Sequence, residues 1–275
     1  MWKLLTTTTL LSSALLAQNN DKQIVEYLET NFKNNPSIKS LDISIVDKTK
    51  LESPKDWTGY MLRLDAVVDD KGKDRQVSQK MVWFAKGSVI APDLIDMDTG
   101  ESLKAMVQPS FKPEFYKKAN LVSGDKNSKH RVAIFSDPLC PFCSQFVPKA
   151  IEDMKKDPKK FAVYYYHFPL AGLHPAAVEL AKAAIVAEQS GRENVVLDLY
   201  KVNINSKERD VKKILEAFNK TLGTKITPSD LEKPSVLKQF NEDQHIAEEL
   251  MVQGTPTLFF DDKLDKTKRK YEKVQ

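Results

Sequence analysis

The spacing of hydrophobic residues in the first hundred positions changes once, from a helical period to strand-like runs. Between residues 21 and 34, apolar side chains recur every three or four positions, which predicts an amphipathic helix. Four runs rich in β-branched and aromatic residues follow, separated by turn residues such as Asp69-Asp70-Lys71-Gly72. The predicted strands are 38–46, 57–68, 76–85 and 88–95. One helix and a small antiparallel sheet are therefore expected here.

Strands and helices alternate in the second half of the chain. Two short apolar runs, 130–135 and 161–166, predict buried strands, and a third strand is expected after residue 256. Helices are expected between the second and third strands, in the alanine-rich segment 167–191 and near 192–203, 207–219 and 235–251. The predicted division of the chain is a leader at 1–17, an N-terminal domain at 18–105, a linker at 106–123 with a helix over 114–122, and a C-terminal domain at 124–275.

The N-terminus has the layout of a secretory signal peptide. Lys3 supplies a positive charge, residues 4–17 are apolar or small, and residues 18–21 are polar. This apolar stretch is shorter than the roughly 20 residues that a membrane-spanning helix needs. We expect cleavage after Ala17 and a soluble, exported protein. An ordinary N-terminal helix is the alternative.

Composition narrows the class of protein. The chain has 275 residues, 41% of them hydrophobic and 29% charged, which is typical of a globular protein and fits two domains. Its formal charge of +4 is small beside 42 basic and 38 acidic residues, so nothing favours a nucleic-acid partner.

Only two cysteines occur, Cys140 and Cys143, and they lie in one segment, Cys-Pro-Phe-Cys. A disulfide between them would close too small a loop to restrain the unfolded chain. A structural zinc site needs four ligands, and the sequence has neither a second cysteine pair nor histidines at paired spacing, so no metal is expected. A pair that opens and closes by thiol–disulfide exchange remains.

The local pattern supports such a pair. The predicted strand 130–135 is broken by Ser136-Asp137-Pro138, and helical spacing begins at Cys140. Pro141 suits a first helical turn, where its missing N–H is not needed. Free amides at a helix start favour a thiolate at Cys140, while Cys143 should lie one turn deeper. We therefore predict an exposed attacking thiol and a buried resolving thiol.

A second motif, Gly254-Thr255-Pro256-Thr257, leads into the last apolar strand. A strand, a CPFC motif at a helix start and a distal GTPT together resemble the thioredoxin fold of the Dsb family. The resemblance implies that Pro256 is cis and packs beside the cysteines, and that Thr255 offers backbone groups to a substrate peptide. The helical insertion is similar to that of the Dsb oxidoreductases. The first half of the chain resembles the small α+β, cystatin-like dimerisation domain of DsbC and DsbG.

The variable positions of the two motifs refine the resemblance. Pro141 and Phe142 are the redox-tuning pair, and Phe142 cannot donate the hydrogen bond that a histidine gives the thiolate in DsbA. Threonine before the cis-proline is the DsbC and DsbG choice. Ile134 replaces the buried acid of thioredoxin, so proton handling for Cys143 would fall to water or Asp137. After Phe260 we expect a hairpin and no closing helix.

The resemblance implies a periplasmic thiol–disulfide isomerase or reductase. It would act as a homodimer on unfolded or misoxidised exported proteins, with a membrane redox partner and no cofactor. Two alternatives stay open. One is a DsbA-like oxidase recharged by a membrane partner, and the other is a dimeric periplasmic chaperone in which the thiols are secondary.

Overall fold

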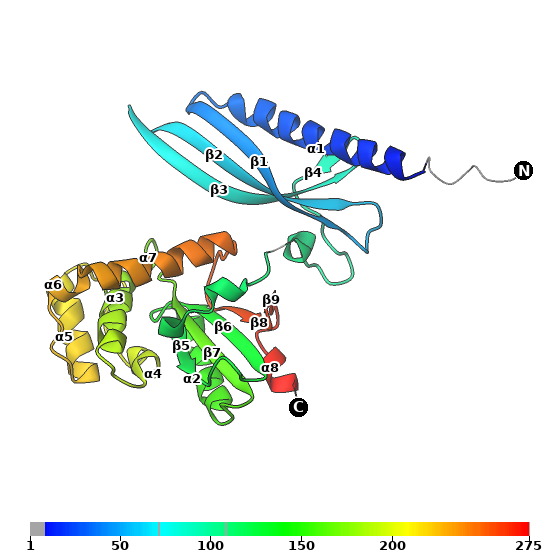
Figure 1. Ribbon diagram of the computed structural model, residues 1–275. Helices are drawn as coiled ribbons and strands as arrows, with labels where there is room; N and C mark the ends of the chain where they lie inside the picture. Colours follow the sequence, from blue (N-terminus) through cyan, green and yellow to red (C-terminus); the bar gives the residue numbers. More distant parts are fainter. Residues whose placement is uncertain (1–8, 71, 108, 275) are drawn as a thin grey trace, which may run out of the picture. The chain divides into compact units, whose positions relative to one another are not determined.

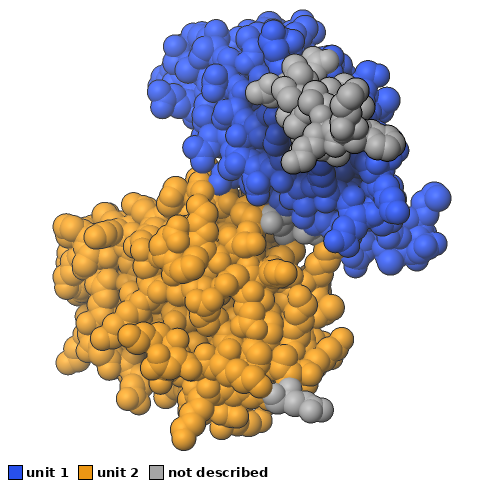
Figure 2. All heavy atoms as spheres, turned by 45° about the vertical axis from the view of Figure 1, so that its right-hand side comes forward, with its two compact units in different colours: residues 1–108 blue, residues 109–275 orange. Residues whose placement is uncertain are grey.

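The computed structural model describes residues 9–70, 72–107 and 109–274. The chain divides into two compact units, Met1–Gln108 and Pro109–Gln275 (Figure 2). Helix α1 begins at Thr9, inside the segment expected to be a signal peptide. The first part of that expected signal, residues 1–8, lies outside the described residues. Among the helices that are described, none is long and apolar enough to cross a membrane.

The first unit is one helix on a four-stranded antiparallel sheet (Figure 1). The strand order follows the sequence, as expected for consecutive hairpins. The last predicted strand, 88–95, is shorter than expected, because Pro92 carries no N–H for a ladder. The elements are α1 (Thr9–Lys33), β1 (Ile38–Lys50), β2 (Thr58–Asp70), β3 (Lys73–Lys86) and β4 (Val89–Ala91).

Helix α1 covers one face of this sheet. Ile24 and Leu28 pack against Tyr60 and Leu62, which point to the same side of β2 because side chains alternate along a strand. The intervening residue, Met61, is also buried, so β2 is covered on both faces in this region.

The second unit is built on a five-stranded mixed sheet of order β5-β7-β6-β8-β9. Strands β6 and β7 are parallel, and every other neighbouring pair is antiparallel. This arrangement, with helices on both faces, is a thioredoxin-like fold. The strands are β5 (Leu121–Ser123), β6 (His130–Ser136), β7 (Phe161–His167), β8 (Thr257–Phe260) and β9 (Lys263–Leu264).

The central strands β6 and β7 are mostly apolar because both faces of the sheet are covered. All seven residues of β7 are buried. Helix α2 (Pro141–Lys155) packs on one face, while Phe111, Phe115 and part of α7 (Pro234–Glu249) pack on the other.

Four further helices follow β7 and precede α7 in the chain (Figure 1). Their buried side chains form a hydrophobic core of their own. The alanine-rich side of α3 lets its neighbours approach closely, and the buried side of α5 supplies the large residues Leu215 and Phe218. These helices are α3 (Ala176–Gln189), α4 (Val195–Leu199), α5 (Val211–Leu222) and α6 (Pro228–Leu231).

Two sequence predictions fail at the ends of this unit. The linker helix predicted over 114–122 is replaced by two 3₁₀ turns, Pro113–Phe115 and Lys118–Asn120, and by strand β5. Pairing of β5 with β7 and burial of Phe115 hold this segment to the sheet and outweigh its helical spacing. The chain also ends in a short helix, α8 (Lys270–Lys273), where no closing helix was expected, although the predicted hairpin is present as β8 and β9.

A buried carboxylate ties the edge of the sheet to α7. Asp243 accepts hydrogen bonds from Asn120 Nδ2 at 2.8 Å and from the backbone N–H of His167 at 3.0 Å. Burial raises the pKa of Asp243 to about 7. Asn120 also donates to the carbonyl of Tyr165 at 3.0 Å, so this cluster joins β7 to the turn before β5.

Among the glycines of the second unit, Gly124, directly after β5, leaves the least room for a side chain. Its φ is +74°, and a Cβ there would lie 2.1 Å from the carbonyl oxygen of Phe161. We predict that Gly124→Ala lowers the free energy of unfolding by more than the roughly 1–3 kcal/mol that an unfavourable φ costs alone.

Two matched variants, compared by urea unfolding, separate the cost of the positive φ from the cost of the clash with the carbonyl oxygen of Phe161. Gly191→Ala shares a positive φ of +81° but meets nothing within 4 Å, so it should show the conformational cost alone. Gly172→Ala has neither feature and should be neutral. Equal stabilities for the Gly124 and Gly191 variants would contradict the predicted clash.

Candidate active site

The CPFC segment lies where β6 has ended and α2 begins, as the sequence predicted. Cys140 is the N-cap residue, with extended φ and ψ of −74° and 123°, and Pro141 is the first helical residue. The carbonyl of Cys140 already accepts the N–H of Ser144 at 3.0 Å. The backbone therefore turns from strand to helix at the first cysteine.

The two thiols differ in depth, but less than predicted. Both are free cysteines, and Cys143 is fully buried while Cys140 is 5% exposed. The prediction of an exposed Cys140 is therefore wrong for this structure. The carbonyl of Thr255 lies only 3.7 Å from its Sγ and shares the cover of the sulfur. The adjacent Phe142 is 74% exposed, so the side chain between the cysteines is the one that faces solvent.

The distal motif meets the cysteines as the resemblance implied. The Thr255–Pro256 peptide bond is cis, which confirms that prediction, and Pro256 is buried. Thr257 Oγ1 donates to the carbonyl of Gly254 at 2.7 Å and fixes the loop. The role of Thr255 and Pro256 in binding substrate stays a prediction.

Burial dominates the chemistry of Cys143. It raises the pKa of this thiol to about 11. The Ser136 hydroxyl is the main group that opposes the rise, because a donor stabilises the thiolate. The Thr255 hydroxyl has a smaller effect, and it completes no hydrogen bond to any described residue.

Ser136 belongs to a chain of hydroxyls that the sequence did not reveal. Its Oγ lies 2.6 Å from the hydroxyl of Tyr200, which lies 3.1 Å from the hydroxyl of Tyr165. Burial raises the pKa of both tyrosines well above 10, so their protons stay in place as donors. Residues 136, 165 and 200 are far apart in the chain. The one feature of the sequence that could have indicated this contact is that each residue places a polar group within an apolar run.

Asp137 shapes the loop before Cys140. One carboxylate oxygen accepts the N–H of Leu139 at 2.7 Å. The other accepts the N–H of Leu170 at 2.8 Å and lies 2.9 Å from Nδ1 of His174. A part for water or Asp137 in moving protons to and from Cys143 stays a prediction.

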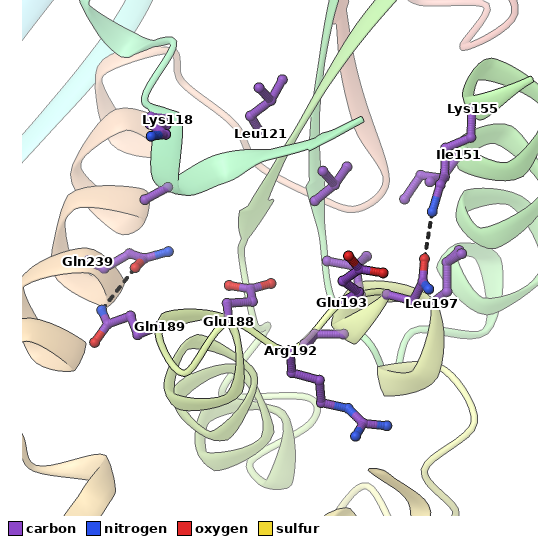
Figure 3. Close-up of a pocket in the computed structure, with 15 residues that line it drawn as sticks. Lys118, Leu121, Ile151, Lys155, Glu188, Gln189, Arg192, Glu193, Leu197 and Gln239 are labelled. Atoms are coloured by element: carbon purple, nitrogen blue, oxygen red, sulfur yellow. Dashed lines mark hydrogen bonds between the residues drawn. The ribbon is translucent and has the colours of Figure 1, made fainter. Parts of the chain in front are cut away.

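Two grooves of similar size mark the surface of this unit. One, of about 660 Å³, runs between β5, α2 and the α3–α4 segment and includes Glu188 and Lys155, but neither cysteine (Figure 3). The other, of about 630 Å³, is lined by Phe142, Thr255 and Pro256 and adjoins the redox motif. We therefore place the candidate substrate site at the second groove. No group of three or more potential metal ligands occurs in the described part of the chain.

A family model described as Thioredoxin matches residues 117–275. The chain belongs to the thioredoxin family. The match covers the second unit from the end of its first 3₁₀ turn onward, and includes both CPFC and the cis-proline loop. The first unit lies outside it.

Individual thioredoxin-family relatives are distant. A probable thiol:disulfide interchange protein DsbC from Bordetella avium is 28% identical over 189 residues, covering 69% of this chain. The chain spans about half of that relative's length, 54%. A thioredoxin-like oxidoreductase structure from Silicibacter pomeroyi is 23% identical, with a TM-score of 0.43 over 55% of this chain and 84% of that one. BdbD from Bacillus subtilis is 22% identical, with a TM-score of 0.44 over 60% and 90%.

Removing the Ser136 hydroxyl should raise the pKa of Cys143 further, because the thiolate loses its main donor. The thiolate fraction of Cys143 at pH 8 then falls by about tenfold for each unit by which its pKa rises. The higher nucleophilicity of the more basic thiolate offsets part of the resulting loss in rate. We predict that Ser136→Ala slows resolution of a Cys140–glutathione mixed disulfide by about 3- to 10-fold at pH 8.

Stopped-flow measurements between pH 7 and 10 would test this, with the same fold decrease expected at each pH below the pKa. Ser190→Ala is the matched control, since that hydroxyl bonds the carbonyl of Val186 at a helix end. An unchanged resolution rate in Ser136→Ala would exclude the hydroxyl from this step.

Proposed function

We propose that the protein is a thiol–disulfide oxidoreductase that acts as an isomerase or reductase on exported proteins. The observation that carries the proposal is the placement of Cys140 at the start of α2, 3.7 Å from the carbonyl beside a cis-proline, with Cys143 buried one turn below. The groove lined by Phe142, Thr255 and Pro256 adjoins this cysteine and supports a substrate chain binding beside it.

In the first step the Cys140 thiolate attacks one sulfur of a substrate disulfide. A mixed disulfide forms, the substrate S–S bond breaks, and the departing substrate thiolate takes a proton from solvent. In this proposal the carbonyl and N–H of Thr255 hold the substrate backbone against the cis-proline loop during this step.

Two routes lead onward. The freed substrate thiol can attack another substrate disulfide, and a substrate thiolate can then displace Cys140, so the substrate is isomerised without net oxidation or reduction. Alternatively, Cys143 attacks the Cys140 sulfur, which releases a reduced substrate and leaves a Cys140–Cys143 disulfide. An external dithiol must then reduce that disulfide before the next cycle.

The buried resolving thiol favours the first route. Because burial raises the pKa of Cys143 to about 11, only a small fraction of this thiol is ionised at pH 7. Resolution is therefore slow, and the mixed disulfide persists while the substrate rearranges. Phe142 adds to this preference. Its side chain gives the Cys140 thiolate no hydrogen bond, so the reduced form of the protein is not stabilised as it is in a strong oxidant.

The first unit supports a proposal about assembly. Its outermost strand, β1, is 13 residues long and leaves one row of backbone groups unpaired by the sheet. We propose that this small α+β unit, cystatin-like in its helix-on-sheet arrangement, pairs two copies of the chain. Export by a signal peptide at 1–17 to the periplasm, and a membrane redox partner there, belong to the same proposal.

The cysteine roles can be tested with single variants. Cys143→Ser should accumulate a mixed disulfide with substrate, visible as a higher band on a non-reducing gel, because the resolver is gone. Cys140→Ser should trap nothing and lose exchange. Trapping by the Cys140 variant and not by the Cys143 variant would show that the roles are reversed.

The state of the thiols in cells separates the alternatives. Alkylation of growing cells should find Cys140 and Cys143 reduced in an isomerase or reductase. A largely oxidised pair would indicate an oxidase instead. Retention of activity against aggregation after both cysteines are changed to serine, with no exchange activity in the native protein, would indicate a chaperone.

Light scattering of the full chain at micromolar concentration should give the mass of a dimer, and a monomer mass would contradict the proposed assembly. A truncated, monomeric variant should begin at Pro109. A start near Ser123, which the sequence suggested, would remove Phe111 and Phe115 from the core of the second unit. The variant from Pro109 should keep thiol exchange and lose isomerisation.

A further inference from the structure

We propose that the groove beside the redox pair is a binding site for acidic substrate segments, so that disulfides flanked by Asp or Glu exchange fastest. This inference rests on the proposed thiol–disulfide exchange. It concerns which substrates are preferred, and the evidence is the chemistry of the groove walls.

One wall of the groove is apolar and adjoins the cysteines. It consists of Phe142, Phe146 and Pro256. Phe142 is 74% exposed, although a phenyl ring gains free energy when it is covered. A substrate chain that brings a disulfide to Cys140 would cover this ring.

A basic wall is formed by Lys268 and Arg269, on the turn before α8, and Lys149 on α2 adds a third cation to the groove. Glu272 is the one acidic residue among the described lining residues. The Arg269–Glu272 pair is 3.9 Å apart with side chains 65% and 44% exposed, so it neutralises little of the charge. Within the described part of the chain, neither Lys149 nor Lys268 has a carboxylate within 4 Å, although the charge of Lys149 lowers the pKa of Asp153. The groove lining therefore carries three cations and one carboxylate.

The basic wall is fixed in place by a buried acid. Asp265 is 2% exposed, and its carboxylate accepts the N–H of Thr267 at 3.0 Å, the Thr267 hydroxyl at 2.7 Å and the N–H of Lys270 at 2.8 Å. These bonds set the turn that carries Lys268, whose φ is +60°, and Arg269. The cations are thus held at the groove by an ordered turn.

The same segment is attached to the catalytic helix. Tyr271 is buried in the cluster that contains Cys140 and Cys143 and also lines the groove. A substrate segment next to an attacked disulfide would therefore contact the aromatic wall and the cations together. Exposed ion pairs contribute modestly, so we expect about 1.5- to 5-fold in rate for each cation that is engaged.

The test compares two disulfide-bonded peptides that differ only in two Asp or two Lys residues beside the cysteines. Their reduction by the reduced full-length protein is followed at 50 mM and 500 mM salt. The wild type should reduce the acidic peptide about 3- to 20-fold faster at low salt, and screening should shrink this ratio at high salt.

The double variant Lys268→Glu/Arg269→Glu should reverse the preference. Lys270→Glu/Lys273→Glu is the matched control, since it makes the same change in net charge on the same segment but outside the groove lining. It should keep the wild-type preference. Equal rates for the two peptides with wild-type protein, or an equal reversal in the control variant, would overturn the proposal.

A binding measurement separates this proposal from the exchange activity. Labelled acidic and basic peptides with serine in place of cysteine are titrated by fluorescence anisotropy. The acidic peptide should bind more tightly to the wild type and to the control variant, and this difference should be lost in Lys268→Glu/Arg269→Glu. That result would support the groove's preference even if no exchange occurred. In that case only the proposed exchange activity would be contradicted. No difference in binding between the two peptides would overturn the groove's preference.

Discussion

The antiparallel pairing of β6 with β8 is the constraint on which the candidate site depends. Its register places Phe135 opposite Thr257, so the residues after β6 and those before β8 meet at one end of the sheet. Cys140 and Thr255 are 115 residues apart and still come within 3.7 Å. A slip of one residue would move Leu258 and Phe260 from the core beside α2 to the opposite face of the sheet, so both cores would have to repack.

The same packing sets the reactivity of the second thiol. Cys143 lies in the core between α2 and the sheet, where an ionised sulfur is poorly solvated, and its pKa rises to about 11. Ser136 is the last residue of β6, and its hydroxyl, joined to Tyr200 and Tyr165, supplies a donor where Ile134 replaces the acid of thioredoxin. Burial and this donor make the largest opposing contributions to the pKa of Cys143, on which its proposed role as the resolving thiol depends.

Local rules were enough to predict the parts of the site that are continuous in sequence. A strand, a breaker and a Pro at the first helical position placed Cys140 at the start of α2, and the order of depth of the thiols was correct. The near-complete burial of Cys140 was missed because its cover comes from Thr255, which only the tertiary fold brings close. For the same reason the contacts of the Asp137 carboxylate with Leu170 and His174 could not be predicted. The segment 114–122 looked helical by spacing alone, and pairing with β7 decided otherwise.

The proposed reactivity and the proposed substrate preference depend on different parts of the second unit. The redox pair depends on the sheet and α2, which share one core, whereas the basic wall of the groove lies on the turn fixed by Asp265 near the chain's end. A charge change at Lys268 or Arg269 leaves the packing around Cys143 intact, because both side chains line the groove and neither belongs to that core. Substrate preference can therefore vary through this turn while the sulfur chemistry stays constant. A change at Tyr271 would affect both the groove and the packing around the cysteines, since that residue belongs to both.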